Sequence, residues 1–206
     1  MNLKLRLAGW RMSESMLIKE LGKVANLTTE GLDELLQTHA PNALRTIRKK
    51  DVPLKGDLQE RRSIMASRHN IRVQALIKEL GENEAIRLGR VKMFEVGKQL
   101  GHDARKRLGV GDELQDLISA AKVLYKVLGI SFNVEEKEGR KFLRIGRCAL
   151  ADHYTAEACH VLSAADEGVV RGLNPQVGMT FKKRITEGES ECIAYLELET
   201  SKVVEK

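Results

Sequence analysis

Cysteine is the residue type that points most directly to chemistry in this chain. All three cysteines, Cys148, Cys159 and Cys192, lie between Arg144 and Glu199, and none precedes this segment. A thiolate is both a soft metal ligand and a nucleophile, whereas a buried thiol packs like a small apolar residue. An odd number of cysteines excludes a complete set of disulfides as their purpose. We therefore expect the functional site in the segment 144–199.

One interpretation of the three cysteines is a metal centre that holds zinc or an iron–sulfur cluster. Such closed sites usually take four protein ligands, and the spacing here matches no short zinc-finger or ferredoxin motif. On the helix expected in this segment, Cys159 and Asp166 share one edge of the buried stripe. His153, His160 and Glu167 fall on the opposite side, which is expected to be solvated. Asp166 is therefore preferred over His160 and His153 as the fourth ligand.

A second interpretation is that Cys148 is a catalytic nucleophile. Such a cysteine needs a nearby cation, base or helix N-terminus to favour its thiolate. Arg147 and a helix expected to begin near Ala151 would supply this field, and His153 is the base nearest in sequence. A third interpretation is that the cysteines are small buried core residues with no chemical role.

The hydrophobic periodicity changes from helical to alternating near residue 129, which predicts an α+β fold. Helices are expected over residues 13–25, 28–37, 57–80, 82–108, 112–128 and 151–173. Strands are expected over 130–135, 141–148, 176–185 and 191–199. We predict helices packed on an antiparallel sheet built from two β-hairpins, with a helical N-terminal extension over 1–56 and a ligand-binding domain over 57–200. The boundary follows a linker over 49–56.

Three glycines in the helix over 82–108 lie on one face, because Gly89, Gly97 and Gly101 recur eight and four residues apart. Glycine costs about 1 kcal/mol relative to alanine inside a helix, so the pattern has a reason. One reason is close packing against a neighbouring helix. The other is space left for a ligand.

The end of the chain resembles a known superfamily. A hairpin ending at Cys148, a helix with Cys159, and a last hairpin with Gly188-Glu189-Ser190-Glu191-Cys192-Ile193-Ala194 are similar to the 4-vinyl reductase domain and the amino-thiazoline-carboxylate hydrolase-like proteins. Members close with Gly-Asp-x-x-Cys-x-Phe, so Glu189 and Ala194 depart from the pattern. The resemblance covers about residues 85–199.

The resemblance implies a small-molecule pocket between the helices and the sheet. Tyr125, Phe132, Met179 and Phe181 are expected to line this pocket, with the three cysteines at its closing end. The resemblance implies that the protein is a ligand-binding or metal-binding module. Its alternative is a cysteine-dependent hydrolase of a cyclic, thiazoline-type C–N substrate. A homodimer is expected, since domains of this size often complete their core in that way.

The net charge of +6 raises the alternative of a basic protein that binds a partner or nucleic acid. Its basic residues would be Arg45, Arg48, Lys49, Lys50, Arg61, Arg62, Arg68 and Arg72. Aromatic residues make up only 4% of the chain, so little is available to stack on bases. We therefore expect these residues to form a solvated surface and expect no nucleic-acid binding. No apolar run is long enough for a membrane helix, and a cytoplasmic location is expected.

Overall fold

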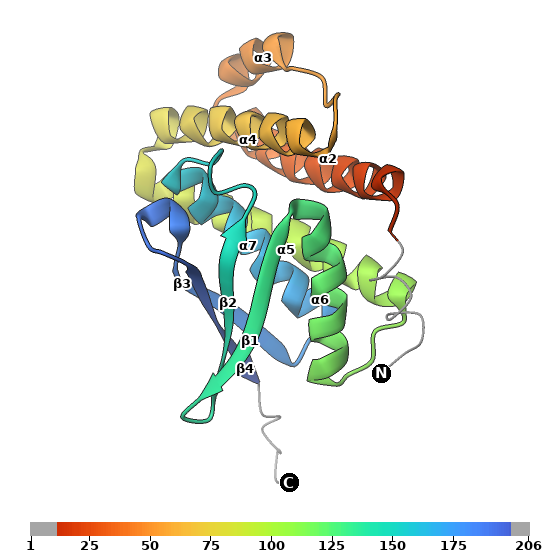
Figure 1. Ribbon diagram of the computed structural model, residues 1–206. Coiled ribbons are helices and arrows are strands. Elements are labelled where there is room, and N and C mark those ends of the chain that lie inside the picture. Colours follow the sequence, from red (N-terminus) through yellow and green to blue (C-terminus); the bar gives the residue numbers. More distant parts are fainter. Residues whose placement is uncertain (1–11, 199–206) are drawn as a thin grey trace, which may run out of the picture.

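The computed structural model describes residues 12–198, which form six α-helices and a four-stranded sheet (Figure 1). The helices are α2 (Glu14–His39), α3 (Pro41–Lys50), α4 (Leu58–Leu80), α5 (Glu82–Leu108), α6 (Leu114–Leu128) and α7 (Ala156–Leu173). The strands are β1 (Ile130–Lys137), β2 (Arg140–Cys148), β3 (Val177–Lys183) and β4 (Cys192–Leu198), with a 3-10 turn, η1 (Ile185–Glu187), before β4. The predicted α+β fold is confirmed.

Two hairpins build the sheet, in the order β1-β2-β4-β3, with every neighbouring pair antiparallel. The first hairpin turns at Glu138 and Gly139, whose φ angles of 54° and 73° are those of a two-residue hairpin loop. Side chains alternate between the two faces of each strand. Leu143 and Ile145 of β2 and Ala194 of β4 are therefore buried on the face that the helices cover.

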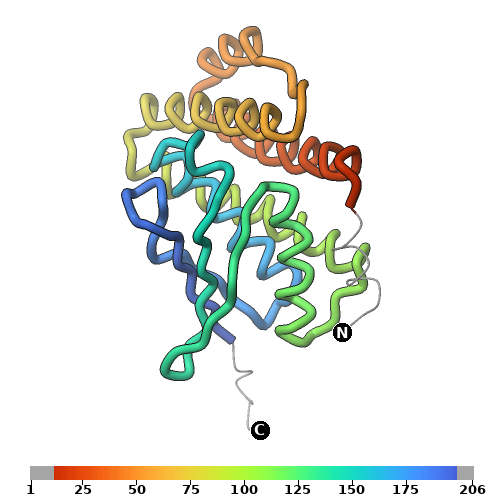
Figure 2. Tube along the Cα trace, viewed as in Figure 1, coloured from red at the N-terminus to blue at the C-terminus, as the bar shows by residue number. Residues whose placement is uncertain are grey.

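Helix α7 is the centre of the molecule, because it lies between the sheet and α5 (Figure 2). The contact with α5 is the most extensive between any two elements and depends on glycine. A Cβ atom on Gly97 would lie 1.9 Å from the carbonyl oxygen of Ala165, and one on Gly101 would lie 2.3 Å from that of Val169. The packing interpretation of the glycine face is therefore confirmed.

The N-terminal part differs from the prediction. Two helices were expected over 13–25 and 28–37, but α2 is continuous from Glu14 to His39. Thr28 begins no second helix, because its hydroxyl donates to the Val24 carbonyl one turn earlier, at 2.8 Å. Ser13 is the predicted N-cap and accepts the Met16 N–H.

Two of the basic residues expected at a solvated surface are buried instead. Arg72 is 1% exposed and binds Asp33 and Asp51 at 2.6 Å each. Arg62 donates to the Val127 carbonyl at 2.9 Å, which satisfies an acceptor at the C-terminal end of α6. The expectation of solvation is wrong for both, since their charges tie α4 to neighbouring elements.

The segment between α3 and α4 contains residue 56, where the extension was predicted to end. Helices α2 and α3 share a hydrophobic core with α4, α5 and α7.

Among residues 12–198, no helix is both long and apolar enough to cross a bilayer.

Candidate functional site

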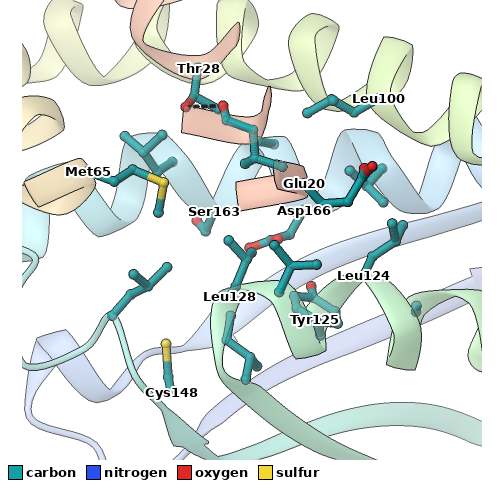
Figure 3. Close-up of a pocket in the computed structure, with 18 of the residues that line it drawn as sticks. Glu20, Thr28, Met65, Leu100, Leu124, Tyr125, Leu128, Cys148, Ser163 and Asp166 are labelled. Atoms are coloured by element: carbon teal, nitrogen blue, oxygen red, sulfur yellow. Dashed lines mark hydrogen bonds between the residues drawn. The ribbon is translucent and has the colours of Figure 1, made fainter. Parts of the chain in front are cut away.

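A cavity of about 860 Å³ lies between α2, the helices α4 to α7 and one end of the sheet (Figure 3). Its walls come from α2, α4, α5, α6 and α7, from ends of the strands, and from the loop after β2. Most lining side chains are apolar and include Met16, Met65, Leu100, Leu124 and Leu128. Ligand pockets in proteins typically measure about 300–1,000 Å³, so this cavity has the size of a binding site.

The cavity has an open end with charged, solvent-accessible side chains, defined here by Glu20 and Lys23 of α2 and Asp103 and Arg107 of α5. Glu20 accepts from Arg107 at 3.0 Å and from Lys23 at 2.8 Å. The charge of the Glu20 carboxylate is therefore already compensated within the protein.

A second part of the lining is less exposed and is called the deep end here. It is defined by Tyr125, Cys148, Cys159, Asp166 and Cys192, which are buried or half-buried and line the cavity. Cys148 ends β2, Cys192 begins β4, and Cys159 and Asp166 come from α7. The Cys192 sulfur also accepts the Ile185 N–H at 3.3 Å. The three predicted cysteines and Asp166 thus line the same cavity, although they lie far apart in the sequence.

The predicted metal site has no preformed ligand set in the part of the chain that the structure describes. There, no three His, Cys, Asp or Glu side chains are grouped closely enough to hold a metal ion. In this arrangement the described side chains do not form a site for zinc or an iron–sulfur cluster.

Burial keeps the cysteine thiols protonated at neutral pH. Desolvation raises the pKa of Cys148 to about 12 and that of Cys159 to about 11. Desolvation also raises the pKa of Cys192. A reactive cysteine instead has a lowered pKa, next to a cation or at a helix N-terminus.

Asp166 is the carboxyl group of the deep end. It keeps some accessible surface because it faces the cavity, whereas the protein surrounds it on its other sides. Desolvation raises its pKa from 3.8 to about 7. The Tyr125 hydroxyl lies beside it (Figure 3) and is buried without a hydrogen bond of normal geometry. A carboxyl with a pKa near neutrality is a common feature of functional sites.

The surroundings of Cys148 differ from those expected for a nucleophile. Helix α7 begins at Ala156 with Thr155 as its N-cap, so the helix start expected near Ala151 is wrong. His153 does not line the cavity, and its ring lies 3.5 Å from the Gln59 amide. The structure brings Cys148 to the cavity without bringing His153 there.

His160 and Glu167 of α7 were predicted to lie on the solvated side of this helix. His160 is half-buried, does not line the cavity, and its carbonyl accepts from Arg90. Glu167 is 7% exposed, pairs with Arg90 at 2.8 Å and accepts the Phe181 N–H at 3.2 Å. The expectation that Glu167 is solvated is wrong, because α7 is covered by the sheet as well as by α5.

The four predicted ligand-binding residues divide into two groups. Tyr125 and Phe181 line the cavity. Phe132 and Met179 belong to the core between the helices and the sheet. There the Phe132 ring packs edge-on against Tyr125, with the two ring centroids 5.3 Å apart.

Sequence reasoning missed the wall that α2 and α4 contribute. His69 of α4 is buried and lies between the Thr28 hydroxyl at 2.9 Å and the Tyr154 hydroxyl at 2.7 Å. Because the Thr28 hydroxyl donates to Val24, it accepts from His69, which in turn accepts from Tyr154. Desolvation lowers the pKa of His69 to about 3, so the ring is neutral. Nothing in the local pattern of either helix pointed to a cavity behind them.

Comparison with a solved structure supports the fold. Subunit 3 of a trafficking protein particle complex from Naegleria fowleri, described as covalently bound to palmitic acid, aligns with a TM-score of 0.54 and 16% identity. The alignment covers 68% of this chain and 95% of the subunit. An H-NOX protein from S. oneidensis in the Fe(II)NO ligation state aligns with a TM-score of 0.46 and 12% identity, over 84% of this chain and 98% of that protein.

No curated protein matches the chain. A family model does match it, over residues 61–195, and its description is L-2-amino-thiazoline-4-carboxylic acid hydrolase. That range includes all three cysteines, Asp166 and the whole sheet except its last residues. It spans well over half of the sequence, and the chain therefore belongs to the L-2-amino-thiazoline-4-carboxylic acid hydrolase family.

Proposed function

We propose that the protein binds a small, largely apolar molecule in the cavity between α2, α6 and α7. The observation that carries this proposal is the cavity itself, with a volume of about 860 Å³ and mostly apolar walls. Protein interiors are packed as densely as organic crystals, and unfilled apolar volume lowers stability. A cavity of this size is expected to be kept for a ligand that fills it.

The volume of the cavity favours a ligand larger than a single small ring. Its lining reaches from the open end at Glu20 to the deep end at Cys148 and Asp166. An amino-thiazoline carboxylate would fill a small part of this volume. The trafficking subunit, which shares the fold, is described as carrying palmitic acid. An alkyl chain is therefore a suitable body for the ligand.

The expected result is saturable binding of N-phenyl-1-naphthylamine, a neutral dye that fluoresces in apolar sites, and its displacement by dodecanol. Leu124→Trp replaces an aliphatic side chain of α6 that lines the cavity with a larger indole ring and is expected to weaken dye binding at least about tenfold. Fluorescence titration measures both affinities.

The matched control is Val91→Trp, since Val91 of α5 is 54% exposed and does not line the cavity. This variant is expected to bind the dye as the unmodified protein does. The proposal is wrong if the dye does not bind, or if Leu124→Trp and Val91→Trp bind it equally well.

The second candidate function is hydrolysis of a cyclic thiazoline-type C–N bond, which membership of the family favours. Hydrolysis through Cys148 would require a thiolate and a base. The raised pKa of about 12 weighs against that route, and so does the fact that His153 is not among the residues that line the cavity.

Alkylation by iodoacetamide tests this route. With a pKa of about 12, fewer than about one Cys148 thiol in a thousand is ionised at pH 7.5. We expect slow labelling of the folded protein and fast labelling of the same protein in urea, followed by peptide mass spectrometry. Fast labelling of folded protein at Cys148, together with turnover of 2-amino-thiazoline-4-carboxylate that Cys148→Ser abolishes, would establish the hydrolase instead.

A further inference from the structure

The deep end of the cavity holds an acidic group without a counter-ion. No described Lys, Arg or His side chain contributes to the environment that sets the pKa of Asp166. The buried Arg184 also lines the cavity, but its guanidinium is engaged by Ser163 and Glu187, each at 3.3 Å. Burying a carboxyl is unfavourable unless it is paired and hydrogen-bonded, so Asp166 lacks the partners that such groups usually have.

Among the described residues, a second polar group of the deep end has only Asp166 as its polar neighbour. The Tyr125 side chain is 5% exposed and lines the cavity, and its hydroxyl interacts with the Asp166 carboxyl, whose pKa it lowers, without making a hydrogen bond of normal geometry. Figure 3 places this hydroxyl and the Asp166 carboxyl next to each other and facing the cavity. Buried polar atoms are nearly always hydrogen-bonded, so a carboxyl and a hydroxyl that have only each other, with no described cation beside them, leave room for a further polar partner.

We propose that the deep end binds a protonated nitrogen group of the ligand, an amine or amidinium, with Asp166 as its counter-ion and Tyr125 as a hydrogen-bond acceptor. This inference rests on the proposed function, since it names the polar end of the same apolar ligand. An ammonium group has only donors and no acceptor, which matches a carboxylate and the lone pairs of a hydroxyl. A ligand with a carboxylate at this position would place its negative charge against the Asp166 carboxylate, which would repel it.

Attraction to the protein as a whole does not explain such a preference. The chain carries a net charge of +6, which repels a cationic ligand at long range. At the open end, the Glu20 carboxylate is already paired with Lys23 and Arg107. A preference for a cationic ligand would therefore have to come from the Asp166 carboxyl inside the cavity.

The binding of a cation at Asp166 is also expected to depend on pH. The pKa of about 7 means that Asp166 gains its charge between pH 6 and pH 8. Desolvation raises the pKa values of the neighbouring thiols and of Tyr125, which keeps these groups neutral, and Glu167 is paired with Arg90. The ionisable groups around Asp166 are Tyr125 of α6, Tyr154, Cys148 of β2, Cys159 and Glu167 of α7, and Cys192 of β4.

The experiment compares three probes that share one alkyl chain: dodecylamine, dodecanol and dodecanoate. Each displaces N-phenyl-1-naphthylamine from the full-length protein at pH 6 and pH 8, below its micelle concentration. At pH 8 we expect dodecylamine to bind at least about tenfold more tightly than dodecanol, with a smaller ratio at pH 6. Asp166→Asn is expected to reduce the ratio to within about twofold at both pH values. Glu95→Gln, an exposed acid of α5 outside the cavity, is the matched control and is expected to keep the ratio.

The outcomes separate this inference from the proposed function. If dodecanol displaces the dye but dodecylamine is no better, or if the preference survives Asp166→Asn, the amine site is wrong and apolar binding stands. A preference lost in Glu20→Gln rather than in Asp166→Asn would place the cation at the open end and overturn the inference. Tightest binding of dodecanoate would overturn it in favour of an anionic group. If none of the three displaces the dye, the proposed function fails as well.

Discussion

Gly97→Ala is expected to lower the free energy of unfolding by at least about 3 kcal/mol, because it separates α5 from α7. The added Cβ atom would lie 1.9 Å from the Ala165 carbonyl oxygen and 2.6 Å from its carbonyl carbon. These are backbone atoms of the central helix, so no side-chain rotation relieves the overlap. Urea denaturation followed by circular dichroism measures the loss.

Gly22→Ala is the matched control for this substitution. Gly22 is inside α2, and nothing lies within 4 Å of the position that a Cβ would take. Alanine there is expected to stabilise the protein by up to about 1 kcal/mol, as glycine-to-alanine changes inside helices do. A Gly97→Ala protein as stable as Gly22→Ala would show that α5 and α7 are not in close contact.

Asp166→Asn is expected to stabilise the unliganded protein, and the gain is expected to increase with pH. The folded protein raises the pKa of Asp166 above the value of 3.8 for an unperturbed Asp. The folded state therefore holds a proton that the unfolded state releases, and stability from this group is lost as pH rises from about 4 to about 7. The raised pKa corresponds to about 4 kcal/mol at pH 8 and about 1 kcal/mol at pH 4.5.

Urea denaturation of both proteins at pH 4.5 and pH 8 measures this difference. Asparagine has nearly the same size and carries no charge, so it removes the cost of ionisation and leaves the packing in place. Asp103→Asn, an exposed acid of α5, is expected to change stability by less than about 0.5 kcal/mol at either pH. A gain from Asp166→Asn that is equal at the two pH values would contradict the origin assigned to the raised pKa.

The sheet could be predicted from the sequence because its signals are local. Alternation along 130–135 and 191–199 identifies the buried face, and Glu138-Gly139 defines the turn that sets the register of the first hairpin. The glycine face of α5 was equally readable as a packing surface. The family resemblance, carried by the spacing from Gly188 to Cys192, is confirmed by the match over residues 61–195.

The errors come from interactions between distant parts of the chain. Arg72 was expected in solvent, because nothing near it indicates that Asp33 and Asp51 will enclose it. Glu167 was placed on a solvated side because a helical wheel assumes one exposed face, whereas α7 is covered on both sides. Threonine at position 28 suggested a helix start, although its hydroxyl bonds within a continuous helix.

For the site, the family resemblance predicted a pocket with the cysteines at one end, but nothing in the sequence indicated that α2 and α4 supply one of its walls. Cys148, Cys159, Cys192 and Asp166 do line one cavity. Cys148 packs against buried residues of α2 and α4, whereas Cys192 belongs to the core between the helices and the sheet. The metal centre, the homodimer and the cytoplasmic location stay predictions.

Residues 16–28 of α2 form one side of the cavity, yet the family model begins only at residue 61. The helix that covers the cavity and the polar groups inside it are thus encoded in separate stretches of the gene. If the cavity binds a ligand as proposed, mutations in this helix are expected to change the length or breadth of the ligand that fits without altering Asp166. Relatives that keep the inner residues but replace this helix would then differ in selectivity while retaining a common mode of anchoring.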